Sequence, residues 1–293
     1  MTTSSAERLS LADISKSFGT LRALDGVSMT VKRGSVHGLL GENGAGKSTL
    51  LRILSGVMEP TGGTISVDGV RVSGHGPLAA RRAGIAMIHQ ELQHVPELTV
   101  AQNMFLGRPL RMAGGLLVDR RAQERAARQA LAPLDAAIDP AAPIRTLKVA
   151  QRQIVEIARA LMEDARIIAM DEPTSSLTPA EFDRLAVLIR DLSASGVSII
   201  YVSHKMDEVF RVCDTATILR DGRKVADVAM AETTEADVVS RMVGRELAHA
   251  EHKGFATDDV VLDVENLSRS GAVKGASFQL KRGEVLGISG LVG

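Results

Sequence analysis

The sequence predicts an α/β fold in which helices surround a mixed sheet, with an antiparallel β subdomain and a helical side lobe. Short apolar segments typical of buried strands alternate with amphipathic helical segments, as expected for parallel strands joined by crossover helices. A glycine-rich loop follows one of these strands directly and leads into a helix. A long stretch over residues 98–161 has helical apolar spacing and accounts for the side lobe.

The N-terminal part contains the expected antiparallel strands. Apolar and polar residues alternate over 9–18, and a second strand over 25–34 ends in a turn. The segment 62–72 is typical of a hairpin with Asp68-Gly69 at its bend. Residues 35–41 form a short apolar strand, and 47–56 has the spacing of a helix that ends at Gly56.

The C-terminal half continues the alternation of helices and strands. One apolar stripe is expected along 151–162, formed by Ile154, Val155, Ala158, Leu161 and Met162. The other expected elements are a helix over 119–135 that ends near Pro133, a buried strand over 165–173, a helix over 181–196, a buried strand over 197–204, and a hairpin over 215–230 that turns at Asp221-Gly222.

Composition limits the classes of function. The 293 residues are 45% hydrophobic and 24% charged, and Lys plus Arg (35) equals Asp plus Glu (35), so no net charge attracts nucleic acid or an anionic membrane. Cys213 is the single cysteine, which excludes an internal disulfide framework. No apolar stretch approaches the ~18 residues of a transmembrane helix, and the start lacks a secretory pattern. We therefore expect a soluble, cytoplasmic chain whose membrane role, if any, runs through a partner.

An internal repeat indicates two related domains. The segment VSMTVKRGSVHGLLGENG, which starts at Val27, recurs without a gap as ASFQLKRGEVLGISGLVG, which starts at Ala276. The second copy stops where the first continues to AGKST. We expect a first domain over 1–247, a linker over 248–259, and the truncated start of a second domain over 260–293.

The strongest motif fits the phosphate-binding pattern GxxxxGK[ST] and lies between a strand and a helix, as the pattern requires. Its glycines let successive backbone N–H groups converge on phosphate oxygens. The Lys47 ammonium supplies charge for the β- and γ-phosphates, and the Ser48 hydroxyl can ligate Mg²⁺. A glycine-rich turn with a chance lysine is the alternative. The expected nucleotide contacts are Gly41, Glu42, Asn43, Gly44, Ala45, Gly46, Lys47, Ser48 and Thr49.

Two carboxylates lie at the end of the buried strand expected over 165–173. The carboxyl ends of strands in open α/β sheets are where ligands bind, so Asp171 is expected to hold Mg²⁺, directly or through water. Glu172 is expected to act as the general base for the attacking water. A strand that ends in Asp-Glu-Pro can also be a plain turn, but the phosphate-binding loop earlier in the chain favours catalysis.

Further segments resemble those of ABC ATPases, which are P-loop NTPases. The resemblance covers residues from about 9 to 245, with the motifs in family order. Ile88-His89-Gln90-Glu91 resembles the Q-loop, Leu147-Lys148-Val149-Ala150-Gln151 takes the place of the LSGGQ signature, Ser175-Ser176-Leu177-Thr178 resembles the D-loop, Ser203-His204 resembles the H-loop, and Phe18 resembles the aromatic residue that stacks on adenine.

The resemblance implies roles for these residues. Gln90 would contact Mg²⁺ or the attacking water and sense a membrane partner. His204 would hydrogen-bond the γ-phosphate and orient Glu172. The signature residues would contact ATP held by an opposite ATPase domain. Each residue also has a purely structural interpretation. Gln90 can be a surface amide, His204 can cap a strand end, and Phe18 can be a core residue.

Within the family, the segments around Gln90, 95–108 and 150–158 resemble ATPases of ribose-, galactose- and xylose-type importers. The resemblance implies a motor subunit that hydrolyses ATP with Mg²⁺ and drives permease subunits of a simple-sugar importer from the inner face of the membrane. A periplasmic sugar-binding protein would act indirectly, and nucleic acid would play no part. Those ATPases fuse two ATPase domains in one chain, which agrees with the internal repeat.

The signature departs from the family pattern, because Lys148 replaces a serine and Val149-Ala150 replace two glycines. A lysine cannot copy a short hydroxyl, so we expect the half-site that this signature completes to hydrolyse ATP poorly. The half-site built on Lys47 and Glu172 would be the active one, with its signature supplied by the second domain. The chain by itself is therefore expected to bind ATP and turn it over slowly.

Two other classes of function remain open. A soluble ABC ATPase that acts on ribosomes or nucleic acid would favour a basic linker or zinc-type cysteines, and the sequence has neither. A P-loop protein of another kind, such as a small-molecule kinase, would not need the segments around Gln90, Lys148 and His204.

Overall fold

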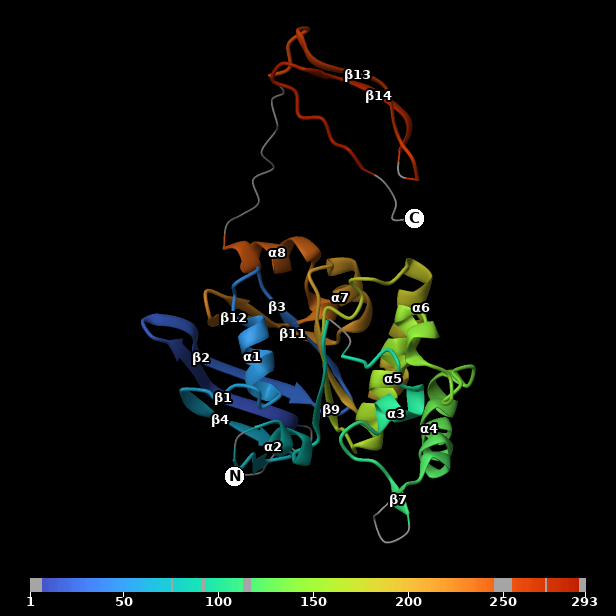
Figure 1. The fold of residues 1–293 in the computed structure, drawn as a ribbon. Helices are drawn as coiled ribbons and strands as arrows, with labels where there is room; N and C mark the ends of the chain where they lie inside the picture. Colours follow the sequence, from blue (N-terminus) through green and yellow to red (C-terminus); the bar gives the residue numbers. More distant parts are fainter. Residues whose placement is uncertain are drawn as a thin grey trace. The chain divides into compact units, whose positions relative to one another are not determined.

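The fold is described from a computed structural model, which covers residues 7–74, 76–90, 93–112, 117–244, 255–271 and 273–289. The backbone divides into two compact units, Met1–Arg245 and Glu246–Gly293 (Figure 1). Within the described ranges, no helix is long and apolar enough to cross a membrane. The first unit contains all the candidate site residues.

A six-stranded mixed sheet forms the centre of the first unit. Its strand order is β12-β11-β3-β10-β9-β6, and only the edge strand β12 is antiparallel to its neighbour. The predicted strands are confirmed, with the bounds β3 Val36–Leu40, β9 Ile167–Asp171, β10 Ser198–Val202, β11 Thr215–Arg220 and β12 Arg223–Ala229. The edge strand β6 Ile85–Ile88 was not predicted from the sequence.

A four-stranded antiparallel sheet, in the order β2-β1-β4-β5, makes up the β subdomain. The hairpin between β4 and β5 turns at Asp68 (φ 51°) and Gly69 (φ 78°), the left-handed conformations of a two-residue hairpin loop. The predicted turn is therefore confirmed. The strands are β1 Glu7–Phe18, β2 Leu21–Lys32, β4 Gly62–Val67 and β5 Val70–Arg71.

The helices cover the sheets and build the side lobe, in which α3, α4 and α5 pack together (Figure 1). The helix over 119–135 ends near Pro133, as predicted, and continues to Asp135, because a proline in the last turn removes a single hydrogen bond. The helices are α1 Lys47–Leu54, α2 Pro77–Arg82, α3 Val100–Met104, α4 Arg120–Asp135, α5 Val149–Met162, α6 Pro179–Ala194, α7 Met206–Val212 and α8 Glu235–Val243, and a small hairpin pairs β7 Arg111–Met112 with β8 Leu117–Val118.

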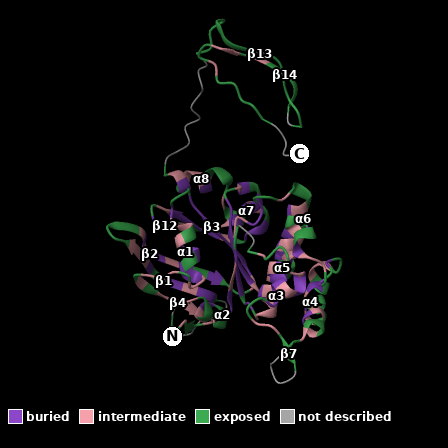
Figure 2. Cartoon of the chain, in the orientation of Figure 1, coloured by how far each residue is buried: buried purple, intermediate pink, exposed green. Residues whose placement is uncertain are grey.

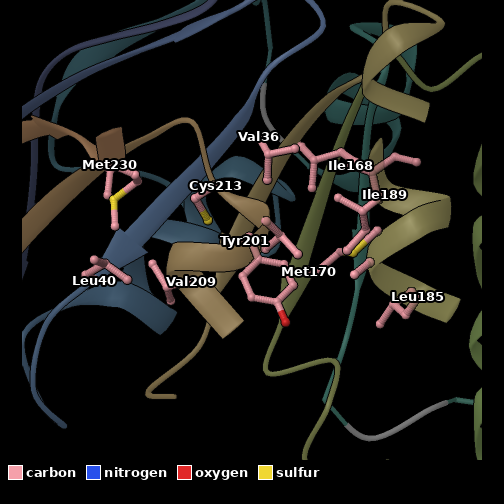
Figure 3. Close-up of a cluster of buried hydrophobic side chains, with 14 of the residues drawn as sticks. Val36, Leu40, Ile168, Met170, Leu185, Ile189, Tyr201, Val209, Cys213 and Met230 are labelled. Atoms are coloured by element: carbon pink, nitrogen blue, oxygen red, sulfur yellow. The ribbon is translucent and has the colours of Figure 1, made fainter. Parts of the chain in front are cut away.

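Hydrophobic side chains of the central sheet pack on both of its faces, and the buried residues follow the central strands in Figure 2. On β10, Ile199 and Tyr201 lie in a cluster with residues of α6, α7 and α8, whereas Ile200 and Val202 lie in a cluster with α1 and the β subdomain. Figure 3 shows the Tyr201 ring within the first of these clusters.

The predicted stripe on α5 is only partly correct. Val155 and Ala158 pack into the side lobe, but Ile157 and Ala160 are buried in the cluster beside the central sheet. The helix is therefore buried on two sides, because it lies between the side lobe and the sheet. A single amphipathic stripe cannot describe a helix in that position.

The second unit contains an antiparallel hairpin of β13 Val260–Arg269 and β14 Val273–Lys281. It repeats local details of the hairpin of β1 and β2. The amide of Asn266 (φ 49°) donates to Ser277 Oγ at 2.9 Å, as the amide of Asp13 (φ 54°) donates to Ser28 Oγ at 2.9 Å. The sequence repeat is thus also a repeat of backbone structure. Part of the expected linker, residues 248–254, lies outside the described residues.

Candidate active site

The phosphate-binding loop runs from the end of β3 to the start of α1, as predicted. Two glycines permit its path. A Cβ at Gly41 (φ 152°) would lie 2.4 Å from the Leu219 carbonyl oxygen, and one at Gly46 (φ 103°) would lie 2.9 Å from the Ala23 carbonyl oxygen. Any side chain at either position would push the loop away from the sheet, so the glycines set its shape.

Lys47 is the first residue of α1, and its side chain returns over the loop. The ammonium donates hydrogen bonds to the carbonyl oxygens of Gly41 (2.7 Å) and Glu42 (3.0 Å). Burial lowers the Lys47 pKa, and the nearby Glu172 and Asp171 carboxylates offset part of this effect. A half-buried cation held by neutral carbonyls can transfer to phosphate oxygens, which are stronger partners.

Asp171 and Glu172 lie at the carboxyl end of β9. Val202 of β10 pairs with Asp171, and the Glu172 amide donates to the Val202 carbonyl at 2.9 Å. Glu172 has a φ of 45°, a left-handed conformation that is strained for a residue with a side chain and clusters at functional sites. This conformation turns the chain sharply after β9. The side chains of Asp171 and Glu172 can therefore contact different partners.

The Glu172 carboxylate lies between the two residues expected to assist it. Gln90 Nε2 donates to one carboxylate oxygen at 3.1 Å, and His204 Nδ1 lies 3.1 Å from the other. Gln90 follows β6, Glu172 follows β9 and His204 follows β10. The parallel order of these strands therefore brings together three residues that are far apart in the sequence. Glu91, the next residue of the expected Q-loop, lies outside the described residues.

Asp171 has the properties of a ligand for a hard cation. Burial raises the pKa of its carboxyl, and repulsion from Glu172 raises it further. A divalent cation at this position would relieve both effects. The Asp171 carboxylate, the Ser48 hydroxyl and the Gln90 amide line one cavity, and oxygen ligands of this kind fit Mg²⁺. These residues are therefore suited to the metal that the sequence predicted.

The cavity joins the loop to the carboxylates. Of the predicted site residues, six from the phosphate-binding loop lie along it together with Gln90 and both carboxylates, and His204 reaches it through Glu172. The residues that line the cavity are Ala23, Asn43, Gly44, Gly46, Lys47, Ser48, Thr49, Gln90, Asp171 and Glu172.

Phe18 does not line this cavity. It ends β1, is 46% exposed, and its ring lies 5.3 Å from the Lys16 ammonium. The alternative that Phe18 is a core residue is therefore wrong, because its ring is open to solvent. The exposed ring leaves a face available for stacking, so the adenine contact stays a prediction.

The signature residues form a separate site at the start of α5, and they do not line the cavity either. Leu147 is buried in the side lobe, whereas Val149 is 39% exposed. The Lys148 amide donates to Gln151 Oε1 at 3.2 Å, which caps the first turn.

The sequence did not predict a role for Gln153, one turn further along α5. Its side chain is 6% exposed, and Nε2 donates to the carbonyl of Pro173, the residue after Glu172. The helix α5 is thereby joined to the chain that follows β9 and carries Glu172. A polar residue within an otherwise apolar face of a helix was the available signal.

Comparison with known proteins decides the family. Residues 24–175, which include the phosphate-binding loop and both carboxylates, match the family model described as ABC transporter. The chain belongs to the ABC transporter family. This result confirms the resemblance seen in the sequence.

Curated members of the ABC transporter family match almost the whole chain. The chain is 48% identical over 287 residues to a putative ribose/galactose/methyl galactoside import ATP-binding protein of Agrobacterium fabrum, with 97% of this chain and 56% of that protein covered. It is 47% identical to an arabinose import ATP-binding protein of Burkholderia thailandensis, with 98% and 57% covered. The chain thus spans about half the length of the curated relatives it matches.

Solved structures confirm the ABC ATPase fold. The ADP conformation of MJ1267, an ATP-binding cassette of an ABC transporter, superposes with a TM-score of 0.71 at 26% identity, covering 82% of this chain and 99% of that one. A nucleotide-free cassette gives a TM-score of 0.69 at 26% identity, with 81% and 95% covered. The expected fold class, a P-loop NTPase with a mixed sheet, an antiparallel subdomain and a helical lobe, is therefore correct.

Proposed function

We propose that the chain binds and hydrolyses ATP with Mg²⁺, as a motor subunit of an ABC importer for a simple sugar. The observation that supports it best is the position of Glu172, which is bound by Gln90 and His204 at the edge of the cavity that Lys47 and Ser48 also line. A base, a cation and a set of loop amides then surround one bound triphosphate.

The roles of the residues follow from their positions. Backbone amides of the loop and the Lys47 ammonium bind the phosphates, and the ammonium exchanges its carbonyl partners for phosphate oxygens. Ser48, Asp171 and Gln90 would hold Mg²⁺, which neutralises charge on the phosphates. Glu172 accepts a proton from the attacking water, and His204 keeps Glu172 in place and reaches toward the γ-phosphate. Phe18 stacks on the adenine.

The transport role rests on the relatives, which are named as import ATP-binding proteins for ribose, galactose or arabinose. The chain would act at the inner face of the membrane, docked on permease subunits, with a sugar-binding protein outside acting indirectly. We further propose that 260–293 belongs to a second ATPase domain, because its hairpin repeats that of β1 and β2. That domain, or a second copy of the chain, would supply the signature.

Nucleotide binding and hydrolysis test the catalytic part. Lys47→Ala should weaken ATP binding at least tenfold, because it removes charge-assisted contacts of ~1.5–3 kcal/mol. Glu172→Gln should preserve binding and slow hydrolysis by roughly 10²-fold or more. Titration with a fluorescent ATP analogue, with and without Mg²⁺, and release of phosphate measure the two effects. Absence of Mg²⁺-dependent nucleotide binding would contradict the proposal.

The transport part has a separate test. The tagged chain, purified from detergent-solubilised cells of its source, should retain a polytopic permease. Recovery with ribosomes or nucleic acid instead would support the soluble ABC ATPase.

A further inference from the structure

A buried carboxylate contacts the segments that follow β9 and β10, which carry Glu172 and His204. Glu208 of α7 is 3% exposed, and one of its oxygens accepts three hydrogen bonds, from Thr174 Oγ1 (2.5 Å), Tyr201 OH (3.0 Å) and Ser203 Oγ (3.2 Å). The other oxygen pairs with the Lys205 ammonium at 3.0 Å. We refer to Thr174, Tyr201, Ser203, Lys205 and Glu208 as the Glu208 cluster.

The cluster joins the segments that carry the catalytic residues. Thr174 follows Glu172 by two positions, and Ser203 directly precedes His204. The Lys205 ammonium also donates to the Thr174 carbonyl at 3.3 Å, and the Lys205 amide donates to Ser203 Oγ at 3.1 Å. A single carboxylate therefore holds the chain after β9 against the chain after β10.

The rest of the cluster is anchored in the core. The Tyr201 ring is fully buried in the cluster of hydrophobic side chains shown in Figure 3, where Val209 of α7 is also buried. Packing thus fixes both the Tyr201 hydroxyl, which donates to the carboxylate, and the helix α7, which carries it. The position of Glu208 is therefore set independently of Glu172 and His204.

A buried charge is retained here although its removal from water is unfavourable. Burial alone raises the Glu208 pKa, but the hydrogen bonds from Thr174, Lys205 and Tyr201 together outweigh burial and hold the pKa below its usual value. The group is therefore a carboxylate at neutral pH, with partners for both oxygens. Such a network is specific in geometry, because three hydroxyls and one ammonium must all reach the same carboxylate.

We propose that Glu208 is a positioning residue for ATP hydrolysis, which fixes the spacing of Glu172 and His204 through Thr174 and Ser203. The inference rests on the proposed function and deepens it. Glu208 does not line the nucleotide cavity, so it acts on the hydrolytic step and leaves nucleotide binding unchanged. A displacement on the order of 1 Å at Glu172 is enough to slow the reaction greatly.

The test compares variants of the cluster in the full chain. Glu208→Gln keeps the shape of the side chain but turns an acceptor into a donor that faces other donors. Thr174→Val removes one hydrogen bond to the carboxylate, and Thr174→Ser keeps it. Thr217→Val is the matched control, because Thr217 is equally buried and hydrogen-bonded, to Asp227 and His37, on β11 outside the cavity.

Single-turnover hydrolysis, Mg-ATP affinity and melting temperature are measured for each variant. Glu208→Gln and Thr174→Val should reduce the hydrolysis rate about 10- to 100-fold, with affinity within about twofold of the unsubstituted chain. Thr174→Ser and Thr217→Val should keep the rate within about threefold, although Thr217→Val lowers the melting temperature.

The outcomes separate this inference from the proposed function. If Glu208→Gln does not fold, Thr174→Val against Thr174→Ser decides by itself. Unchanged rates in the cluster variants of an active chain, or equal losses in Thr217→Val, would overturn the positioning role alone. A chain that binds Mg-ATP and never hydrolyses it would overturn the proposed catalysis, and the positioning role with it.

Discussion

Asp171 and Glu172 are neighbours in the chain, but their carboxylates have different surroundings. The Asp171 carboxyl is partly buried beside another negative charge, which raises its pKa, whereas both oxygens of Glu172 have hydrogen-bond partners in Gln90 and His204. Two acids in different environments can perform two tasks, and the function we propose assigns metal binding to Asp171 and proton transfer to Glu172. The cost of the first environment to folding should be measurable.

Asp171→Asn should raise the stability of the nucleotide-free chain. The Asp171 carboxyl has a raised pKa in the folded state, so its contribution to the free energy of unfolding decreases as the pH rises above its unfolded value of about 3.9. Asparagine does not ionise, so the variant should be more stable than the unsubstituted chain near neutral pH, and the gain should shrink toward about pH 4. Urea unfolding across this pH range measures it.

A second carboxyl serves as the control. Asp25 has a lowered pKa, mainly because of its hydrogen bond with Arg223, so Asp25→Asn should destabilise the chain at neutral pH and less in acid. With Mg-ATP present, Asp171→Asn should also lose the stabilisation that nucleotide gives. A destabilising Asp171→Asn would mean that the carboxylate has a partner in the free protein.

At the residue scale, sequence motifs predicted most of the residues that line the cavity but did not predict the Glu208 cluster. Lys47 and Asp171 stand next to glycines or a buried strand, so their surroundings are local and visible in the sequence. Glu208 lies in a short segment with ordinary charged neighbours and looks like a surface residue. Its burial depends on Thr174 and Tyr201, which reach it only through the sheet order.

At the scale of elements, the candidate site residues lie in the connections that follow the strands. The helices after these connections fix the position of the connections. The helix α6 begins at Pro179, two residues after Leu177. Its start has a capping box in which Thr178 and Glu181 exchange hydrogen bonds. Element types were predictable because apolar period and turn residues are local signals. The two-sided burial of α5 was not, since it depends on which elements lie beside it.

Thr178→Ala should destabilise the chain by about 1 kcal/mol, because it leaves an amide of the first turn of α6 without its partner. The melting temperature should fall by roughly 2–4 °C for a domain of this size. Thr178→Ser retains the hydroxyl and is the matched control. Equal melting temperatures for the alanine and serine variants would show that solvent replaces the cap.

At the scale of the molecule, the cavity with Lys47 and the signature at the start of α5 are distinct places on the first unit. The signature residues do not line the cavity, and Val149 is 39% exposed. If the signature contacts nucleotide as we propose, a complete site needs two ATPase domains, each offering its signature to the other's nucleotide. The rate of hydrolysis per chain should then depend on encounters between chains.

Hydrolysis per chain should rise with chain concentration, and excess Lys47→Ala chain should stimulate a low, fixed concentration of unsubstituted chain. The added chain binds ATP poorly but still presents its signature, so it completes the partner's site, although Lys148 in place of a serine should keep the stimulated rate slow. Adding Val149→Asp to the Lys47→Ala chain is the control. An aspartate suits the first turn of a helix, so α5 should remain folded, but its charge would repel the γ-phosphate and remove the stimulation. Phosphate release is measured for the unsubstituted chain alone, with the Lys47→Ala chain, and with the double variant. A rate per chain that changes with neither the concentration nor the added chain would show that the first unit hydrolyses ATP alone.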